Sequence, residues 1–188
     1  AAGVRTIGEG PMIVIFGIVA ALGPALVAAA ALRAGANPLR VAGAATLVTA
    51  ALLPQVTIRP QVLSFAFTGA LLFLLIEARP ETRRRLWLIP LLMLAWANAH
   101  GFFVVGLGIG LVYLVATLIG RTPMREHRAL VFAIAAVSVA ATMVTPSGPG
   151  GLVYALSFGD PGDLGAARIV EWQSPNFHNL EFIGFAGV

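Results

Sequence analysis

The stretch LWLIPLLMLAWANAHGFFVVGLGIGLVYLVATLIG, residues 86–120, decides the fold of this chain. It is 35 residues long, is free of Asp, Glu, Lys and Arg, and is interrupted only by His100. A single helix of that length would extend about 52 Å, whereas the hydrocarbon core of a membrane is ~30 Å thick. Asn98 and Gly101 interrupt helices, so we expect a break within residues 96–101 and a helical hairpin.

The composition of the whole chain is typical of a membrane protein. Of its 188 residues, 59% are hydrophobic and 11% are charged, while a soluble domain has about 25% charged residues. The 12 basic residues are all arginines in short gaps between apolar runs. A nucleic-acid-binding face would need many more, so we expect no nucleic-acid partner. Cysteine is absent, which excludes disulfides, thiolate zinc sites and cysteine nucleophiles.

Other uncharged runs are each long enough for one membrane crossing, which needs about 20 residues. We therefore predict an all-α fold, a polytopic transmembrane helical bundle that forms one domain over residues 1–188. The predicted spans are 11–32, 41–57, 61–77, 86–99, 102–120 and 129–146, followed by an outer loop over 147–180. Residues 182–188 turn apolar again and are expected to begin a partial seventh span.

The arginines provide an independent test of this count. Short cytoplasmic loops of membrane proteins carry an excess of Lys and Arg. With six spans, three loops on one side contain nine of the 12 arginines, namely Arg33, Arg40, Arg79, Arg83, Arg84, Arg85, Arg121, Arg125 and Arg128. A single helix over 86–120 would place the arginines of residues 79–85 and those of residues 121–128 on opposite sides of the membrane. We expect this side to face the cytoplasm and the chain to be a multi-pass protein of the bacterial cytoplasmic membrane.

The remaining polar residues gather on the predicted outer side, which starts with Arg5 and Glu9 and continues with Arg59-Pro60-Gln61. The guanidinium of Arg59 is a planar, permanently charged group that suits phosphate or carboxylate oxygens. In the alternative interpretation, Arg59 reaches lipid headgroups and Pro60 begins the next helix.

Trp96, Asn98 and His100 form a second candidate group, spaced i, i+2 and i+4. On a continuous helix, Trp96 and His100 share a face and Asn98 points away, whereas a break at Asn98 would bring all three together. His100 could then act as a general acid or base, with Asn98 holding a substrate hydroxyl. Alternatively, Trp96 is an anchor at the membrane interface, Asn98 caps a helix and His100 satisfies backbone groups.

Acidic residues of the outer loop form a third candidate group. Asp160, Asp163 and Glu171 could bind a divalent cation alongside a pyrophosphate donor. The aspartates also suit a polar turn over residues 159–163, and Trp172 also suits an interface position.

Gly106-Leu107-Gly108-Ile109-Gly110 resembles a nucleotide-binding loop only superficially. It lies in an apolar helical stretch with no preceding strand, and Gly106 and Gly110 are spaced to form a small-residue packing face.

Several motifs together resemble a known family. They are Ile58-Arg59-Pro60-Gln61, Leu86-Trp87, the stretch from Trp96 to Phe102, Thr145-Pro146-Ser147-Gly148, and Ile169-Val170-Glu171-Trp172-Gln173-Ser174-Pro175. Their order and spacing resemble a family of uncharacterised bacterial polytopic membrane proteins, which is similar to the GT-C superfamily of polyprenol-dependent glycosyltransferases. Where that pattern has Asn-Pro-Tyr-Gly, this chain has Thr145-Pro146-Ser147-Gly148.

The resemblance implies transfer of a sugar from a polyprenyl-phosphate donor to a cell-envelope acceptor at the outer face. It implies catalytic roles for His100 and Glu171, and substrate-binding roles for Arg59, Gln61, Trp96, Asn98 and Trp172. In this reading Arg59 binds the lipid phosphate, and membrane lipid and the lipid-linked sugar are the partners.

The GT-C pattern places a catalytic acid in the first outer loop. That loop would precede or overlap Ala1, where Glu9 is the candidate present. The sequence begins with Ala1 rather than Met, so we expect the chain to be a fragment.

A non-enzymatic membrane protein, either a transporter or a structural subunit, is the alternative. A transporter needs polar residues near mid-depth, whereas an enzyme with a lipid-linked donor keeps them at one face.

Overall fold

The computed structural model describes residues 8–53 and 60–157, which form seven α-helices and no β-strand. The expected all-α fold is therefore observed. The helices are α2 (Glu9–Arg33), α3 (Pro38–Leu52), α4 (Gln61–Ile76), α5 (Leu88–Ala99), α6 (Phe103–Leu118), α7 (Arg128–Thr142) and α8 (Pro149–Leu156). Two short 3-10 helices, η2 (Arg83–Trp87) and η3 (Arg125–His127), precede α5 and α7.

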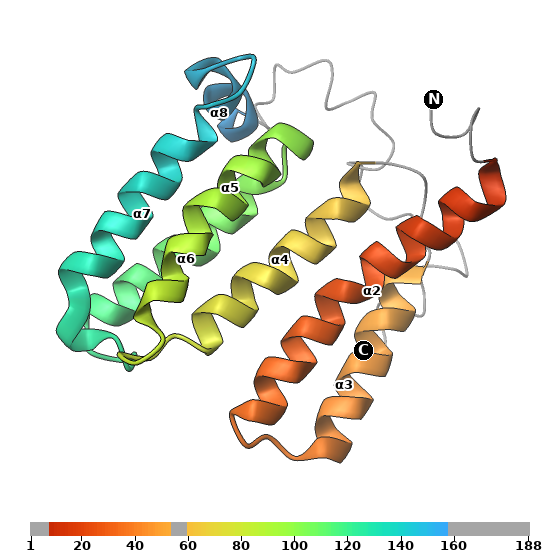
Figure 1. Cartoon of the computed structure of the whole chain (residues 1–188), viewed down its shortest axis with the longest axis horizontal. Helices are drawn as coiled ribbons and strands as arrows, with labels where there is room; N and C mark the ends of the chain where they lie inside the picture. The colour runs from red at the N-terminus through yellow and green to blue at the C-terminus, as the bar shows by residue number, and fades with distance from the viewer. Residues whose placement is uncertain (1–7, 54–59, 158–188) are drawn as a thin grey trace.

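The helices from α2 to α7 run alternately up and down (Figure 1). The 35-residue apolar run is broken as expected, because α5 ends at Ala99 and α6 begins at Phe103. The α2–α3 turn is made by Gly35, with φ of 86°, and by Asn37, whose side chain accepts hydrogen bonds from the amides of Leu39 and Arg40. These two devices end one helix and cap the next.

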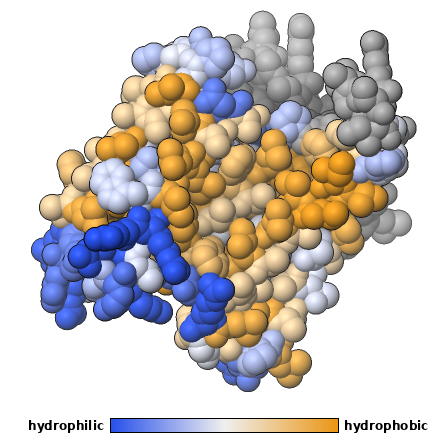
Figure 2. Space-filling model, viewed as in Figure 1, coloured by the Kyte–Doolittle hydropathy of each residue, from blue (hydrophilic) through white to orange (hydrophobic). Residues whose placement is uncertain are grey.

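All nine arginines of the three predicted cytoplasmic loops are exposed, and they lie at one end of the bundle, here called the arginine end (Figures 1 and 2). The opposite end, here called the histidine end, contains the start of α4, the α5–α6 connection and the α7–α8 connection. Large hydrophobic side chains are exposed on the surface between the ends, including Val14, Leu47, Leu111 and Phe132.

One described helix is long and apolar enough to cross a membrane, the stretch Gly10–Arg33 of α2. Pro38–Leu52, Gln61–Ile76 and Phe103–Leu118 are apolar but shorter, since turns and 3-10 segments take residues from the uncharged runs. A 16-residue helix extends about 24 Å, which fits a membrane only if the bilayer thins or the helix ends are buried. Six crossings therefore stay a prediction.

Two close helix contacts depend on glycine. The backbones of Gly23 in α2 and Gly69 in α4 touch, and a Cβ on Gly69 would overlap Gly23. A Cβ on Gly106 in α6 would lie 2.6 Å from Cζ3 of Trp96 and 3.1 Å from the sulfur of Met93 in α5. Gly106 thus packs inside this chain, whereas a Cβ on Gly110 would meet no atom within 4 Å.

The two substitutions Gly106→Ala and Gly108→Ala should have opposite effects on stability. Alanine at Gly108, which faces open space, favours the helix by roughly 0.5–1 kcal/mol. At Gly106 it must displace a fully buried indole ring, and such overpacking costs about 1–3 kcal/mol. Thermal unfolding of the purified protein in detergent measures both; equal midpoints for the two variants would contradict the packing of α6 on α5.

Candidate functional site

A chain of hydrogen bonds joins α4 to the end of α5 at the histidine end. Nε1 of Trp96 donates to Oγ of Ser64 at 3.0 Å, and the same oxygen lies 3.3 Å from Nδ1 of His100. Ser64 is in the first turn of α4, and His100 directly follows α5. Trp96 and Ser64 are both buried. These hydrogen bonds therefore connect two buried side chains to a residue at the end of the bundle.

The helix geometry of α5 positions Trp96 and His100. The helix continues to Ala99, and the backbone N–H of His100 still donates to the carbonyl oxygen of Trp96 at 2.9 Å. The two side chains therefore share a helix face. Extended backbone at His100 (φ −162°, ψ 145°) then ends the helix. Trp96 also stacks on Phe67 of α4, with ring centroids 5.7 Å apart.

The hydrogen-bond partners of His100 determine which ring nitrogen carries the proton. The backbone N–H of Phe102 donates to Nδ1 at 3.3 Å, and a backbone amide can only donate. The indole of Trp96 takes one of the two acceptor lone pairs of the Ser64 hydroxyl, and the hydroxyl hydrogen can point at Nδ1. Nδ1 is therefore an acceptor, and the neutral ring carries its proton on Nε2.

Partial burial favours the neutral form of this ring. Desolvation lowers the pKa of His100 from its ordinary value of 6.5. A second proton on Nδ1 would also face the amide of Phe102. His100 is thus held neutral in the tautomer that donates from Nε2, and no described residue accepts a hydrogen bond from that atom.

Asn98 points away from this group, as expected for a continuous helix. Its side-chain nitrogen donates to the carbonyl oxygens of Leu94 and Val144, each at 2.9 Å. The second bond attaches α5 to the segment that follows α7. That segment closes as a turn, in which the amide of Gly148 donates to the carbonyl oxygen of Thr145 at 2.9 Å. Asn98 therefore positions this corner of the bundle.

The other predicted site residues divide into two groups. Gln61 is the first residue of α4, is half-buried, and lies one turn before Ser64. Arg59, Glu171 and Trp172 lie outside the described residues. The structure thus brings together Trp96 and His100 and places Gln61 on the same helix end as their partner Ser64.

The predicted carboxylate site lies in the part of the chain that the structure does not describe. It consists of Asp160, Asp163 and Glu171. Within residues 8–53 and 60–157, no group of three or more His, Cys, Asp or Glu residues could hold a metal ion.

Sequence reasoning missed Ser64. A signal for it was present, because Trp96 and His100 share a helix face and a buried indole N–H needs an acceptor. Ser64 is a small hydroxyl residue in the first turn of the neighbouring apolar helix. It can supply both the acceptor for the indole and the donor for the imidazole.

Comparisons with protein-family models, with curated protein sequences and with solved structures found no match to this chain.

The protein should become less stable as the pH decreases, and part of this loss should come from His100. Because the folded-state pKa is lowered, the unfolded chain binds more protons as the pH drops below 6.5. The stability contributed by the neutral ring is complete above that value and is lost toward the lower folded-state pKa, by at most about 1.4 kcal/mol per pH unit.

The matched comparison is His100→Asn, which keeps an acceptor near Nδ1 and does not titrate. The unfolding midpoint of the wild type should fall more than that of the variant between pH 7 and pH 5, with His127 and His178 common to both. Parallel pH profiles would contradict the assignment.

Proposed function

We propose that the chain is a multi-pass membrane protein that transfers a sugar from a polyprenyl-phosphate donor to a cell-envelope acceptor. The reaction would take place at the outer face of the bacterial cytoplasmic membrane. The observation that carries this proposal is the separation of polar groups, with nine exposed arginines at one end and the Trp96–Ser64–His100 chain at the other. The apolar surface between them suits lipid and is unfavourable in water.

His100 acts in this proposal as a hydrogen-bond donor. Its Nε2–H is suited to an anionic phosphate oxygen or to a sugar hydroxyl. In this tautomer the ring has no outward lone pair with which to accept a proton, so the general base is a carboxylate. Glu171 is the candidate within the sequence, and the resemblance to GT-C enzymes suggests a further acid in the first outer loop.

The remaining roles follow from the resemblance and from residue chemistry. Arg59 binds the lipid phosphate through its guanidinium fork. Gln61, Trp96, Asn98 and Trp172 contribute to the substrate site, Trp96 through the hydrogen bond that positions Ser64 and Asn98 through the corner it fixes. A divalent cation bound by the loop carboxylates would supply charge neutralisation at a pyrophosphate.

The transporter alternative receives less support. No charged side chain is buried among the described residues. Two buried hydroxyls in α7, those of Ser138 and Thr142, donate to carbonyl oxygens of their own helix. The phenolic oxygen of Tyr113 in α6 is buried without a hydrogen-bond partner among the described residues. A pathway for a polar solute would need several such groups near mid-depth.

Topology mapping tests the membrane arrangement first. A reporter that is active only in the cytoplasm should be active when it is fused after Gly35, Glu81 or Thr122. A reporter that is active only outside should be active when it is fused after Gly101 or Ser147. This alternation follows from the arginine bias. If α2 alone crossed the membrane, all five fusions would report the same side, and the proposal would fail.

Transfer activity in membranes that contain the full chain tests the role of His100. His100→Ala and Arg59→Ala should each reduce transfer from a labelled polyprenyl-phosphate sugar by at least ~10-fold, given the usual contribution of such groups. His100→Gln, which keeps an N–H donor near Nε2 but cannot act as a base, should retain more activity than His100→Asn.

His127→Ala, at the arginine end, is the matched control and should leave transfer unchanged. Equal activity of the wild type and His100→Ala would refute the glycosyltransferase assignment. Equal loss in His100→Gln and His100→Asn would refute the donor role.

A further inference from the structure

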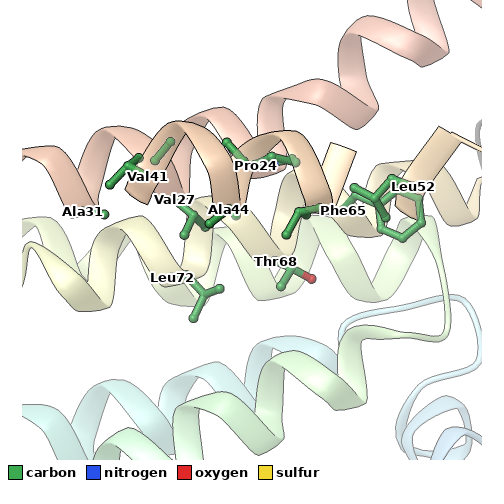
Figure 3. A pocket seen from close by; sticks show the side chains of 14 residues that line it. Pro24, Val27, Ala31, Val41, Ala44, Leu52, Phe65, Thr68 and Leu72 are labelled. Carbon is green, nitrogen blue, oxygen red and sulfur yellow. The ribbon is translucent and has the colours of Figure 1, made fainter. Parts of the chain in front are cut away.

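A long apolar groove lies between α2, α3 and α4 (Figure 3). Its volume is about 400 Å³, and its lining is made by Ala, Gly, Pro, Val, Leu and Phe side chains together with Thr68. The hydroxyl of Thr68 already donates to the carbonyl oxygen of Ser64 at 2.7 Å. The groove therefore offers an occupant apolar contact and no free hydrogen-bond donor.

The groove exists because the three helices are unevenly packed. The contact of Gly23 with Gly69 brings α2 and α4 together, while α3 packs chiefly against α2 and has no buried residue. Small side chains such as Ala31 and Ala44 face the space that is left.

Two arginines lie close to the arginine end of the groove in the sequence. Ala31, Val41 and Leu72 line that end. Arg33 follows Ala31 by two residues, and Arg40 directly precedes Val41. The guanidinium carbon of Arg33 lies 5.2 Å from the centroid of the Phe73 ring in α4.

These two arginines are available to an anion. Both side chains are exposed, and neither forms an ion pair with a carboxylate of the described residues. They lie on either side of the turn that joins the two helices bordering the groove.

The length of the groove matches one leaflet of a bilayer. On α3 the lining runs from Val41 to Leu52, a distance of about 16 Å at 1.5 Å per residue. Half of the ~30 Å hydrocarbon core is about 15 Å. An acyl chain anchored at the arginine end would therefore have apolar contact over a length comparable to one leaflet.

We propose that this groove binds one acyl chain of an anionic phospholipid, whose phosphate is held by Arg33 and Arg40. The proposal rests on the membrane location in the proposed function and is independent of the reaction. Anionic headgroups gather at the cytoplasmic face and attract arginines there. In one phospholipid, the phosphate would contact Arg33 and Arg40, and the acyl chain would contact the apolar lining.

Native mass spectrometry of the full chain in mild detergent, with equimolar phosphatidylglycerol and phosphatidylcholine of identical acyl chains, tests the proposal. The wild type should retain phosphatidylglycerol at least several-fold more than phosphatidylcholine. Arg33→Gln combined with Arg40→Gln should bring that ratio close to one. Ala44→Phe, which fills the groove, should lose both lipids.

Two control variants keep the test specific. Arg83→Gln combined with Arg84→Gln removes exposed charge from another loop, and Ala50→Phe adds the same ring to an exposed position of α3 outside the groove; both should bind lipid like the wild type. Unfolding midpoints confirm that each variant is folded.

Equal retention of the two lipids by the wild type would overturn the proposal. So would equal lipid binding by Ala44→Phe and Ala50→Phe, or a dimer that Ala44→Phe alone dissociates, since the occupant would then be a second copy. Selective lipid binding without glycosyl transfer would refute the proposed reaction and leave the groove assignment standing.

Discussion

The burial of the Trp96 indole is the constraint on which the histidine end depends. The ring stacks on Phe67 of α4, lies against Gly106 of α6, and is fully shielded from solvent. A shielded indole N–H needs an acceptor, and Ser64 supplies it. Ser64 also contacts His100. The packing of the three helices around Trp96 therefore also orients the imidazole of His100.

The all-helical fold is predictable from the sequence, because long uncharged apolar runs indicate helices. A 35-residue apolar run is too long for one membrane crossing, and the arginine pattern favours a hairpin there. The observed boundary at His100 agrees with this reasoning. Helix lengths were less predictable, because uncharged residues such as those in the turn after Leu118 belong to the apolar run but not to the helix.

The candidate site was only partly predictable. The spacing of Trp96 and His100 indicates a shared face, and the structure has it. Asn98 resembles a substrate ligand in sequence, but its partner Val144 is 46 residues away, and no local pattern reveals such a bond. Ser64 was missed for the same reason, since its role depends on tertiary contacts. Arg59, Glu171 and Trp172 lie outside the described residues.

The peripheral position of α3 has a mechanical consequence. It packs chiefly against one neighbour, buries none of its residues, and is joined to α2 through a turn that contains Gly35. Opening free energies are smallest where few apolar contacts must be broken. The distance between α3 and α4 is therefore easier to change than the distance between α2 and α4, and we expect slow amide hydrogen exchange in α4 and α5 rather than in α3.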